Sequence, residues 1–282
     1  MSTRLAYFGP PGTNAEEAAL VYIGEDTDSF ELVPISTITG IARAVQSGGA
    51  DAGIVPIENS LEGSIPETLD LLIHSEKPLF IHAEVVRPIN FYLLAKPGVK
   101  PEDIKAIRSI PIAVAQCRSF IEKTYPDARI EAALSTAAAV EDVMKRDDAA
   151  AIANKRAGDL YGAVALAELI QDRSPNHTRF VIMAPEDHAP TGDDRTSVAF
   201  GFESEDRPGQ LVSALNEFST RRINLTKIES RPSKERLGTY IFLADVVGHR
   251  AQEPLKEALE VIEKSCSFFR VLGSYPRYRP SE

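Results

Sequence analysis

The chain has 282 residues, of which 43% are apolar and 26% are charged. This composition is typical of a soluble globular protein, and the length suffices for two or three compact units with a large core. The net charge of −10 argues against a nucleic-acid partner, because phosphate binding requires a basic face.

Three sequence features concern the compartment. Cys117 and Cys266 are the only cysteines, which is typical of a reducing compartment and excludes a disulfide framework. The first residues lead directly into a strand pattern, and no apolar run approaches membrane-spanning length. We therefore expect a cytoplasmic protein without a signal peptide or a membrane partner.

The apolar pattern up to residue 183 alternates between strand and helix. Strands are predicted at 5–8, 31–35, 52–57, 91–94, 112–114, 149–153 and 178–183. Helices are predicted at 13–22, 38–47, 119–124 and 135–146, within 155–169, and up to residue 74 after a capping box at 64–67. This alternation predicts a mostly parallel sheet with both faces covered.

A different pattern follows a linker. The stretch 184–194 contains two prolines, a glycine and clustered charges without apolar periodicity, so we place the linker at 186–194. Beyond it, strands are predicted at 197–203, 223–229, 239–247 and 268–273, and helices at 210–220 and 254–264. The order βαββαβ predicts a ferredoxin-like sandwich.

A carboxylate, an amide and a hydroxyl follow the buried strand at 52–57, as Glu58, Asn59 and Ser60. Open α/β sheets bind small polar ligands beyond the carboxyl ends of their strands. These three side chains therefore lie where a ligand is expected. The alternative is that they only cap and turn the chain.

Three further stretches allow the same two interpretations. The turn Gly9–Thr13 offers backbone N–H groups to an anion, or is simply a capped βα turn. Gln116 lies just beyond the carboxyl end of the strand predicted at 112–114, where a ligand could bind; the alternative is an ordinary surface amide. Strand alternation places Thr178 and Phe180 on one face and Arg179 on the other, so Thr178 faces a cleft or is an ordinary β-branched strand residue.

In the last domain, Gly209 leaves the start of the helix at 210–220 open to close approach. The backbone N–H groups at the start of this helix could bind a carboxylate, and the Asn224 side chain could bind an amine. The alternative is an ordinary helix cap beside an edge strand. The five histidines lack metal-ligand spacing, and no Gly-x-Ser-x-Gly pattern is present, so neither a metal site nor a serine hydrolase is expected.

In this order the stretches resemble monofunctional prephenate dehydratases with a C-terminal ACT domain, over nearly the full chain. The matching stretches are 9–13, 55–63, 109 with 115–117, 135–137, 172 with 176–180, 209–212 and 224–232. The resemblance implies an α/β catalytic region of two lobes, like a type II periplasmic binding protein, and a ferredoxin-like ACT domain. The implied bounds are 1–185 for the catalytic region (lobe 1 about 1–76 and 170–185, lobe 2 about 77–169) and 195–276 for the ACT domain.

The resemblance also implies roles for individual residues. Catalytic roles fall on Thr178, Glu58 and Asn59. Substrate-binding roles fall on Thr13, Ser60, Gly63, Ser109, Gln116, Ser135, Thr136, Ala137, Arg179 and Phe180. Phenylalanine, the effector, is expected at Gly209, Gln210, Leu211, Val212, Asn224, Leu225, Glu229 and Ser230, at an interface between subunits of a homodimer or homotetramer.

The implied reaction converts prephenate to phenylpyruvate, carbon dioxide and water. Aromatisation of the ring supplies the driving force, so no cofactor is expected. Thr178 would donate a hydrogen bond or proton to the leaving hydroxyl, and Glu58 would orient that group or a partner side chain. Backbone amides of Gly9–Thr13 would hold the carboxylates, and lobe closure would strip water from the carboxylate that is lost.

The chain departs from the family pattern at Ile110, Ile112, Asn90 and Ala15. These departures leave a catalytically inactive amino-acid sensor as the alternative function. A chorismate mutase or a bifunctional enzyme is not expected, because the strand at 5–8 leaves no room for an N-terminal helical domain. A periplasmic solute-binding protein would need an export signal.

Overall fold

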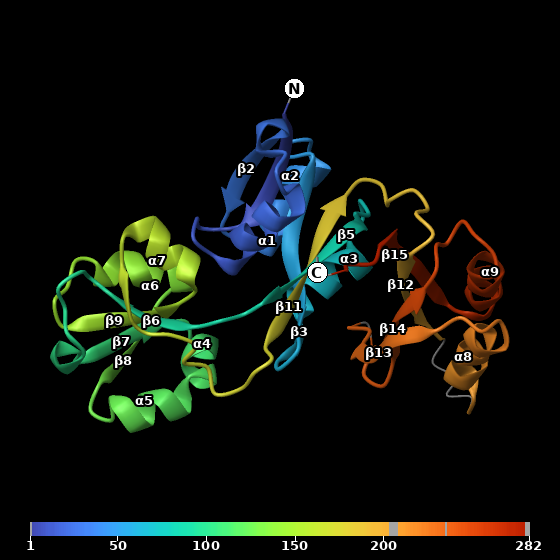
Figure 1. Cartoon of the computed structure of the whole chain (residues 1–282). Coiled ribbons are helices and arrows are strands. Elements are labelled where there is room, and N and C mark those ends of the chain that lie inside the picture. Colours follow the sequence, from blue (N-terminus) through green and yellow to red (C-terminus); the bar gives the residue numbers. More distant parts are fainter. Residues whose placement is uncertain (1, 203–207, 235, 280–282) are drawn as a thin grey trace.

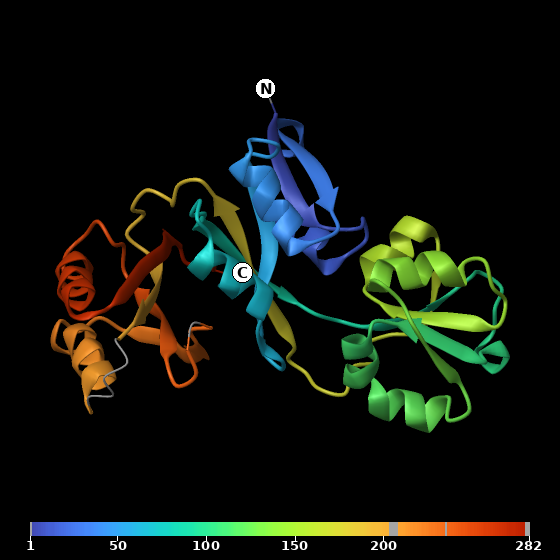
Figure 2. The same ribbon diagram turned by 180° about the vertical axis from the view of Figure 1, so that it is seen from behind.

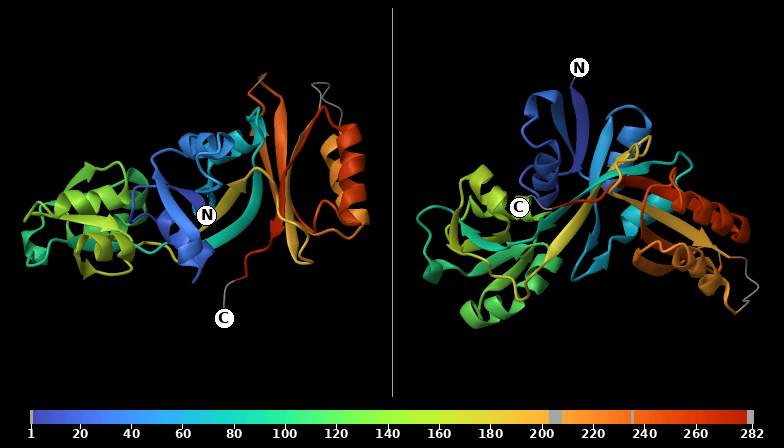
Figure 3. Two further views of the ribbon diagram at one scale, coloured as in Figure 1. Left: turned by 90° about the horizontal axis from the view of Figure 1, so that it is seen from above. Right: turned by 45° about the vertical axis from the view of Figure 1, so that its right-hand side comes forward.

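The computed structural model of the chain describes residues 2–202, 208–234 and 236–279. These residues form three sheets in three bodies, and a first lobe stands between a second lobe and a C-terminal domain (Figure 1). The views from behind (Figure 2) and from above (Figure 3) show the same order. The alternation of strands and helices confirms the expected α/β class.

The sheet of the first lobe has the order β2-β1-β3-β11-β5, with the short β4 beside β3. Its strands are β1 (Thr3–Phe8), β2 (Phe30–Ile35), β3 (Ala52–Asn59), β4 (Gly63–Ser64), β5 (Phe80–Pro88) and β11 (His177–Ala184). Helix α1 (Asn14–Ile23) packs on one face, and α2 (Ile38–Gln46) and α3 (Pro66–His74) pack on the other. The central β3 is therefore apolar on both faces, with Ile54 toward α1 and Val55 toward α2 and α3.

The second lobe is built on a sheet of order β10-β6-β9-β7-β8. Its strands are β6 (Tyr92–Ala95), β7 (Ala106–Ser109), β8 (Arg129–Ala132), β9 (Ala149–Ala153) and β10 (Val164–Ala167). Its helices are α4 (Pro111–Gln116), α5 (Arg118–Thr124), α6 (Thr136–Val143) and α7 (Lys155–Tyr161). The central β9 consists of alanine and isoleucine and is buried throughout, as expected for a strand covered on both faces.

The chain crosses to the second lobe between Pro88 and Tyr92, where β5 ends and β6 begins. The boundary predicted near residue 77 is too early, because β5 pairs with β11 of the first sheet along its length. The strand-rich stretch 79–95 contains two strands that join different sheets. Local apolar pattern carries no information about the sheet that a strand joins, which explains the error.

The strand predicted at 112–114 is also wrong, because these residues lie in helix α4. Pro111 occupies the first helical turn, where a missing N–H is tolerated and the fixed φ favours a helix. A run of three apolar residues is too short to reveal its period. The parallel strand that precedes this helix is β7, which ends at Ser109.

The predicted capping box before α3 is absent. The N-cap is Ile65, whose side chain makes no capping hydrogen bond. Ser64 instead contacts Lys227 and Glu229 of the C-terminal domain. The Ser64 hydroxyl therefore makes a contact between domains and does not cap α3.

The C-terminal domain has the expected βαββαβ order in a sheet β13-β14-β12-β15. Its elements are β12 (Asp194–Gly201), α8 (Gln210–Thr220), β13 (Leu225–Pro232), β14 (Tyr240–Val247), α9 (Leu255–Ser265) and β15 (Phe268–Pro276). Helices α8 and α9 cover one face of this sheet. Glu203, the expected end of its first strand, lies outside the described residues.

The other face of this sheet packs on the first lobe. Ala199, Leu243 and Tyr275 share one apolar core with Leu72 of α3 and Ile81 of β5. A Cβ atom on Gly273 would lie only 2.3 Å from the backbone oxygen of Ile81, so the two backbones meet where only glycine fits. The C-terminal domain is therefore docked closely on the strands of the first lobe.

Candidate active site

Asn59 and Thr178 meet at the end of the first sheet that faces the second lobe. They are partners in the antiparallel ladder of β3 and β11, so their side chains leave the same face. The Asn59 Nδ2 atom donates to Thr178 Oγ1 at 3.0 Å, and the two residues are only 9% and 8% exposed. The structure thus brings together two of the three side chains for which catalytic roles were predicted.

The orientation of the Asn59 amide follows from its backbone partners. Its Oδ1 atom accepts hydrogen bonds from the N–H groups of Leu61 and Glu62, at 2.9 and 3.0 Å. A backbone N–H only donates, so the oxygen must lie on that side and the NH₂ group must face Thr178. The Thr178 oxygen is therefore an acceptor in this contact, and its own hydrogen remains available.

A chain of amide side chains continues from this pair to the second lobe. Asn59 Nδ2 also donates to Asn176 Oδ1 at 2.8 Å, and Asn176 Nδ2 donates to Gln116 Oε1 at 2.9 Å. Gln116 Nε2 then donates to the carboxylate of Glu62 at 2.9 Å. Backbone amides define one end of this chain and a carboxylate the other, and each of its side-chain NH₂ groups donates to at least one acceptor.

Asn176 and Glu62 were not among the predicted site residues, whereas Gln116 was. A signal for Asn176 was present in the sequence, since it lies two residues before Thr178 and strand alternation places such residues on one face. Glu62 carried no comparable signal, because its contact with Gln116 joins different lobes.

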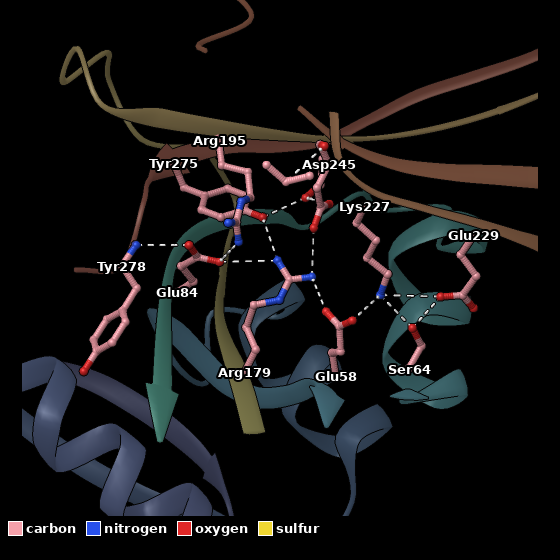
Figure 4. Close-up of polar contacts among 12 residues, drawn as sticks. Glu58, Ser64, Glu84, Arg179, Arg195, Lys227, Glu229, Asp245, Tyr275 and Tyr278 are labelled. Atoms are coloured by element: carbon pink, nitrogen blue, oxygen red, sulfur yellow. Dashed lines mark hydrogen bonds and ion pairs between the residues drawn. The ribbon is translucent and has the colours of Figure 1, made fainter. Parts of the chain in front are cut away.

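Glu58 and Arg179 lie on the opposite face of the same two strands. They are also ladder partners, and Arg179 Nη2 contacts Glu58 Oε2 at 2.9 Å. Both side chains point to the C-terminal domain, where Lys227 and Asp245 are their partners (Figure 4). Catalytic and substrate-binding roles were predicted for Glu58 and Arg179, respectively, whereas the structure places both side chains on the face opposite Thr178, because strand alternation turns them away from it.

The turn Gly9–Thr13 already has an anion, which is the carboxylate of Glu16. The Gly12 N–H donates to Glu16 Oε2 at 2.7 Å. The Thr13 hydroxyl accepts from the Glu16 N–H as an N-cap and donates to the Phe8 carbonyl at 2.9 Å. The capped-turn interpretation is thus the one that the structure favours, and the predicted carboxylate cradle is occupied by the protein itself.

Glu16 also joins the two lobes. Its Oε2 atom contacts Arg156 Nε of α7 at 2.6 Å, and Glu16 is 7% exposed. Burial alone raises the pKa of this carboxyl, but the hydrogen bonds from Arg156 and the Gly12 N–H outweigh burial and lower it. A Cβ atom on Gly12 would lie 3.3 Å from both the Ala137 Cβ and the Ala157 Cα, so the lobes touch closely here.

The remaining predicted substrate-binding residues have mostly structural positions. Ser109 is fully buried, and its hydroxyl donates to the Ile152 carbonyl at 2.7 Å. Ser135 caps α6 through the Ala138 N–H, and Thr136 and Ala137 are buried in its first turn. Phe180 packs in the core beneath α1.

Two predicted residues shape the end of β3. The Ser60 hydroxyl accepts a hydrogen bond from the His177 N–H at 3.0 Å, which ties the end of β3 to the start of β11. Gly63, with φ of +82°, forms the turn into β4 and is open to solvent. Both residues therefore support the backbone around the Asn59–Thr178 pair.

Arg87 is a cation on the face of Thr178 that the sequence did not reveal. It pairs directly with Thr178 in the ladder of β5 and β11, so the Arg87, Thr178 and Asn59 side chains form one row across three strands. Its Nε atom is buried without a hydrogen-bond partner, and its side chain has no ion pair among the described residues. The register of β5 against β11 places it there, and register is not a local property.

The residues expected to bind phenylalanine fall into separate places on one chain. Gly209, in the left-handed conformation, starts α8, and Val212 in its first turn is 59% exposed. Asn224 and Leu225 line a pocket of about 450 Å³ at the other end of this helix. Glu229, also predicted to bind the effector, faces the first lobe, where it contacts Ser64.

Sequence comparison matches residues 5–188 to the prephenate dehydratase family and residues 198–264 to the ACT domain. A prephenate dehydratase of Mycobacteroides abscessus is 41% identical over 280 residues, which cover 97% of this chain and 90% of that protein. The chain belongs to the prephenate dehydratase family. It carries the family's ACT domain after the two-lobed region.

Two solved structures share the fold of this chain over nearly its full length. The prephenate dehydratase of Arthrobacter aurescens, solved in complex with L-Phe, has a TM-score of 0.86 and 36% identity, covering 98% of this chain and 90% of that one. GqqA, described as a novel type of quorum-quenching acylase, has a TM-score of 0.84 and 29% identity, covering 98% of both chains.

In the described ranges, no group of three or more histidine, cysteine, aspartate or glutamate side chains has the arrangement of a metal site. No helix in the described part of the chain combines the length and the apolar character needed to cross a bilayer.

Proposed function

We propose that this chain converts prephenate to phenylpyruvate, carbon dioxide and water, with Thr178 and Asn59 as its catalytic pair. The observation that carries the proposal is the hydrogen bond from Asn59 Nδ2 to Thr178 Oγ1 within a chain of the prephenate dehydratase family. The pair lies beside the connections between the lobes, at the end of a sheet where ligands of α/β proteins bind.

Thr178 acts as a hydrogen-bond donor to the leaving hydroxyl. Its oxygen accepts from Asn59, so its hydrogen is free to point toward the substrate. A neutral alcohol is a weak acid, but negative charge grows on the leaving oxygen as its bond to the ring breaks. A donor already in place strengthens its interaction as that charge develops, and thereby lowers the barrier.

Arg87 replaces the turn Gly9–Thr13 as the group that binds a substrate carboxylate. It lies on the face of Thr178, carries a positive charge, and has no anionic partner among the described residues. A guanidinium binds a carboxylate with strong, charge-assisted hydrogen bonds in a fixed geometry. The substrate has two carboxylates, so a cation at this site fixes its orientation relative to Thr178.

A nucleophilic role for Thr178, as an acylase would require, has less support. A hydroxyl nucleophile needs a neighbouring base that accepts its proton. The hydrogen bond that the structure records for Thr178 Oγ1 comes from the Asn59 NH₂ group, which donates and is not a base. The pair is therefore suited to donating a hydrogen bond rather than to attacking an acyl group.

Phenylalanine regulation through the ACT domain is the second part of the proposal. Gly209 precedes α8 and Asn224 follows it, and the 11 residues of this helix span about 16 Å. One amino acid cannot contact both ends of that helix. We therefore infer that an effector site with both residues takes them from two copies of the chain, which supports a homodimer or a larger homo-oligomer.

The test is a prephenate assay followed by phenylpyruvate absorbance, with and without phenylalanine. We expect turnover of prephenate by the purified chain and a change in rate when phenylalanine is added. Chorismate serves as the control substrate and should not be consumed. A chain that binds phenylalanine but does not turn over prephenate would be the inactive amino-acid sensor.

A further inference from the structure

We propose that Asp245 of the ACT domain is a positioning residue for the Asn59–Thr178 pair, acting through Arg179. The inference rests on the proposed function and extends it: the regulatory domain supports the catalytic strands even when no effector is bound.

Arg179 is held by groups from both domains. Its Nη2 atom contacts Asp245 Oδ2 and Glu58 Oε2, each at 2.9 Å, and its Nη1 atom contacts Glu84 Oε2 at 3.3 Å. Glu58 and Glu84 belong to the first lobe, whereas Asp245 comes from β14 of the ACT sheet (Figure 4). One guanidinium therefore joins three carboxylates across the domain boundary.

Arg179 and its carboxylate partners Asp245 and Glu84 form a buried cluster, where water screens the charges only weakly and each charge is stabilised by the opposite charges beside it. Arg179 is 8% exposed and Asp245 is 7% exposed. Burial alone raises the pKa of the Asp245 carboxyl, but Arg179 and the Ser197 hydroxyl, which donates at 2.6 Å, lower it overall. Asp245 is thus a buried anion, and loss of its charge removes one of the three carboxylates that contact the Arg179 guanidinium.

These contacts reach the catalytic pair through the backbone. Arg179 directly follows Thr178, and Glu58 directly precedes Asn59. A bulge in the ladder lies immediately beside them, between Arg179 and Phe180, and interrupts the regular pairing of β3 with β11 before it resumes at Phe180 and Pro56. The ion pairs on one face therefore contribute to fixing the residues whose side chains meet on the other.

A second contact from the ACT domain, made by Lys227, also binds β3. Lys227 of β13 contacts Glu58 at 3.3 Å and donates to the Ser64 hydroxyl at 2.7 Å. Each catalytic strand is thus bound by an ACT residue at the position next to its catalytic side chain. A shift of about 1 Å in a catalytic group can reduce the rate by up to a hundredfold, so small changes in these contacts matter.

The experiment compares Asp245→Asn with the wild-type chain. Asparagine keeps the size and removes the charge, so we expect kcat to fall by roughly tenfold to a hundredfold with little change in KM. The matched control is Asp70→Asn, which breaks the ion pair of α3 with Arg231 of β13 without contacting β3 or β11. Its kcat should equal that of the wild type, and circular dichroism and melting curves show whether both variants fold.

A double variant distinguishes an effect on the position of Thr178 from a general loss of folding or activity. If Asp245 acts by placing Thr178, then Asp245→Asn should lower kcat far less in a Thr178→Ala background than in the wild type. An equal loss in both backgrounds, or an unchanged kcat in a folded Asp245→Asn variant, would overturn the inference. If Asp245→Asn does not fold, Tyr275→Phe replaces it, since this hydroxyl contacts Arg179 and Ser197.

Hydrogen exchange provides a measurement independent of activity. We expect the peptides that cover residues 57–61 and 176–180 to exchange faster in Asp245→Asn, and those of α6 to stay unchanged. Unchanged exchange in the two catalytic stretches would refute the inference even if prephenate is not the substrate. An inactive wild type with the expected exchange pattern would instead refute the proposed function alone.

Discussion

The Asn59 amide donates a 3.0 Å hydrogen bond to the Thr178 hydroxyl, although 119 residues separate the two in the chain. In this contact the Thr178 oxygen is the acceptor, so the hydroxyl hydrogen remains available to the substrate. Replacement of Thr178 by alanine should therefore reduce kcat by roughly 10²- to 10⁴-fold. Thr178→Ser keeps the hydroxyl and should retain most of the activity, as measured by phenylpyruvate formation. Similar rates for the alanine and serine variants would contradict the role of the hydroxyl.

Arg87 should be required for substrate binding. In Arg87→Gln we expect KM for prephenate to rise about tenfold or more, since a charge-assisted hydrogen bond contributes about 1.5–3 kcal/mol. Arg118→Gln is the control, because this arginine forms an exposed pair with Glu122 on the surface of α5. Steady-state kinetics of both variants test the assignment, and an unchanged KM in Arg87→Gln would exclude the contact with substrate.

The ion pair between Glu16 and Arg156 should make the contact of the lobes sensitive to acid. The pKa of Glu16 is lowered in the folded chain, so its contribution to stability is present above its unfolded pKa of about 4.3 and is lost as pH falls through the folded value. Melting curves recorded from neutral pH downward should show a smaller acid-induced loss in Glu16→Gln than in the wild type. Glu122→Gln, on the exposed α5 pair, should follow the wild-type curve.

Cys117 should be inert toward thiol reagents while the chain is folded. It is fully buried, and burial, together with the charge of Asp172, raises the pKa of its thiol to about 12. The reactive thiolate is therefore scarce at neutral pH. In a thiol titration, partly exposed Cys266 should react first and Cys117 only after denaturant is added. Rapid reaction of both thiols in the folded chain would contradict the packing of α4.

Gly273 should be needed for the docking of the ACT domain. A Cβ atom there would lie 2.3 Å from the Ile81 backbone oxygen, so Gly273→Ala must push β15 away from β5. We expect a lower melting temperature and weaker protection of β5 in hydrogen exchange. Gly192→Ala is a suitable comparison, because its Cβ would meet no atom within 4 Å although its φ is also positive. Equal stability of the two variants would argue against the close approach.

Much of the fold was available from local pattern. The apolar run at 52–57, the helix at 210–220 and the βαββαβ order of the last domain were all predicted, because periodicity and turn residues are properties of short segments. The errors arose where local signals were weak or were overridden. Ile112 to Val114 was too short a run to show a period, and the Ser64 hydroxyl was taken by Lys227 and Glu229.

Sequence patterns alone were sufficient for the family, for the βαββαβ order of the last domain and for the side chains that have the chemistry for the reaction. Which of these side chains lie together depends on how distant segments of the chain pack. Asn59 meets Thr178 while Glu58 meets Arg179, because pairing of β3 with β11 and one bulge set the face on which each side chain lies. Arg87 joins them through the register of β5, and Asp245 through domain docking. Register and docking depend on contacts between distant segments, so no local pattern contains them.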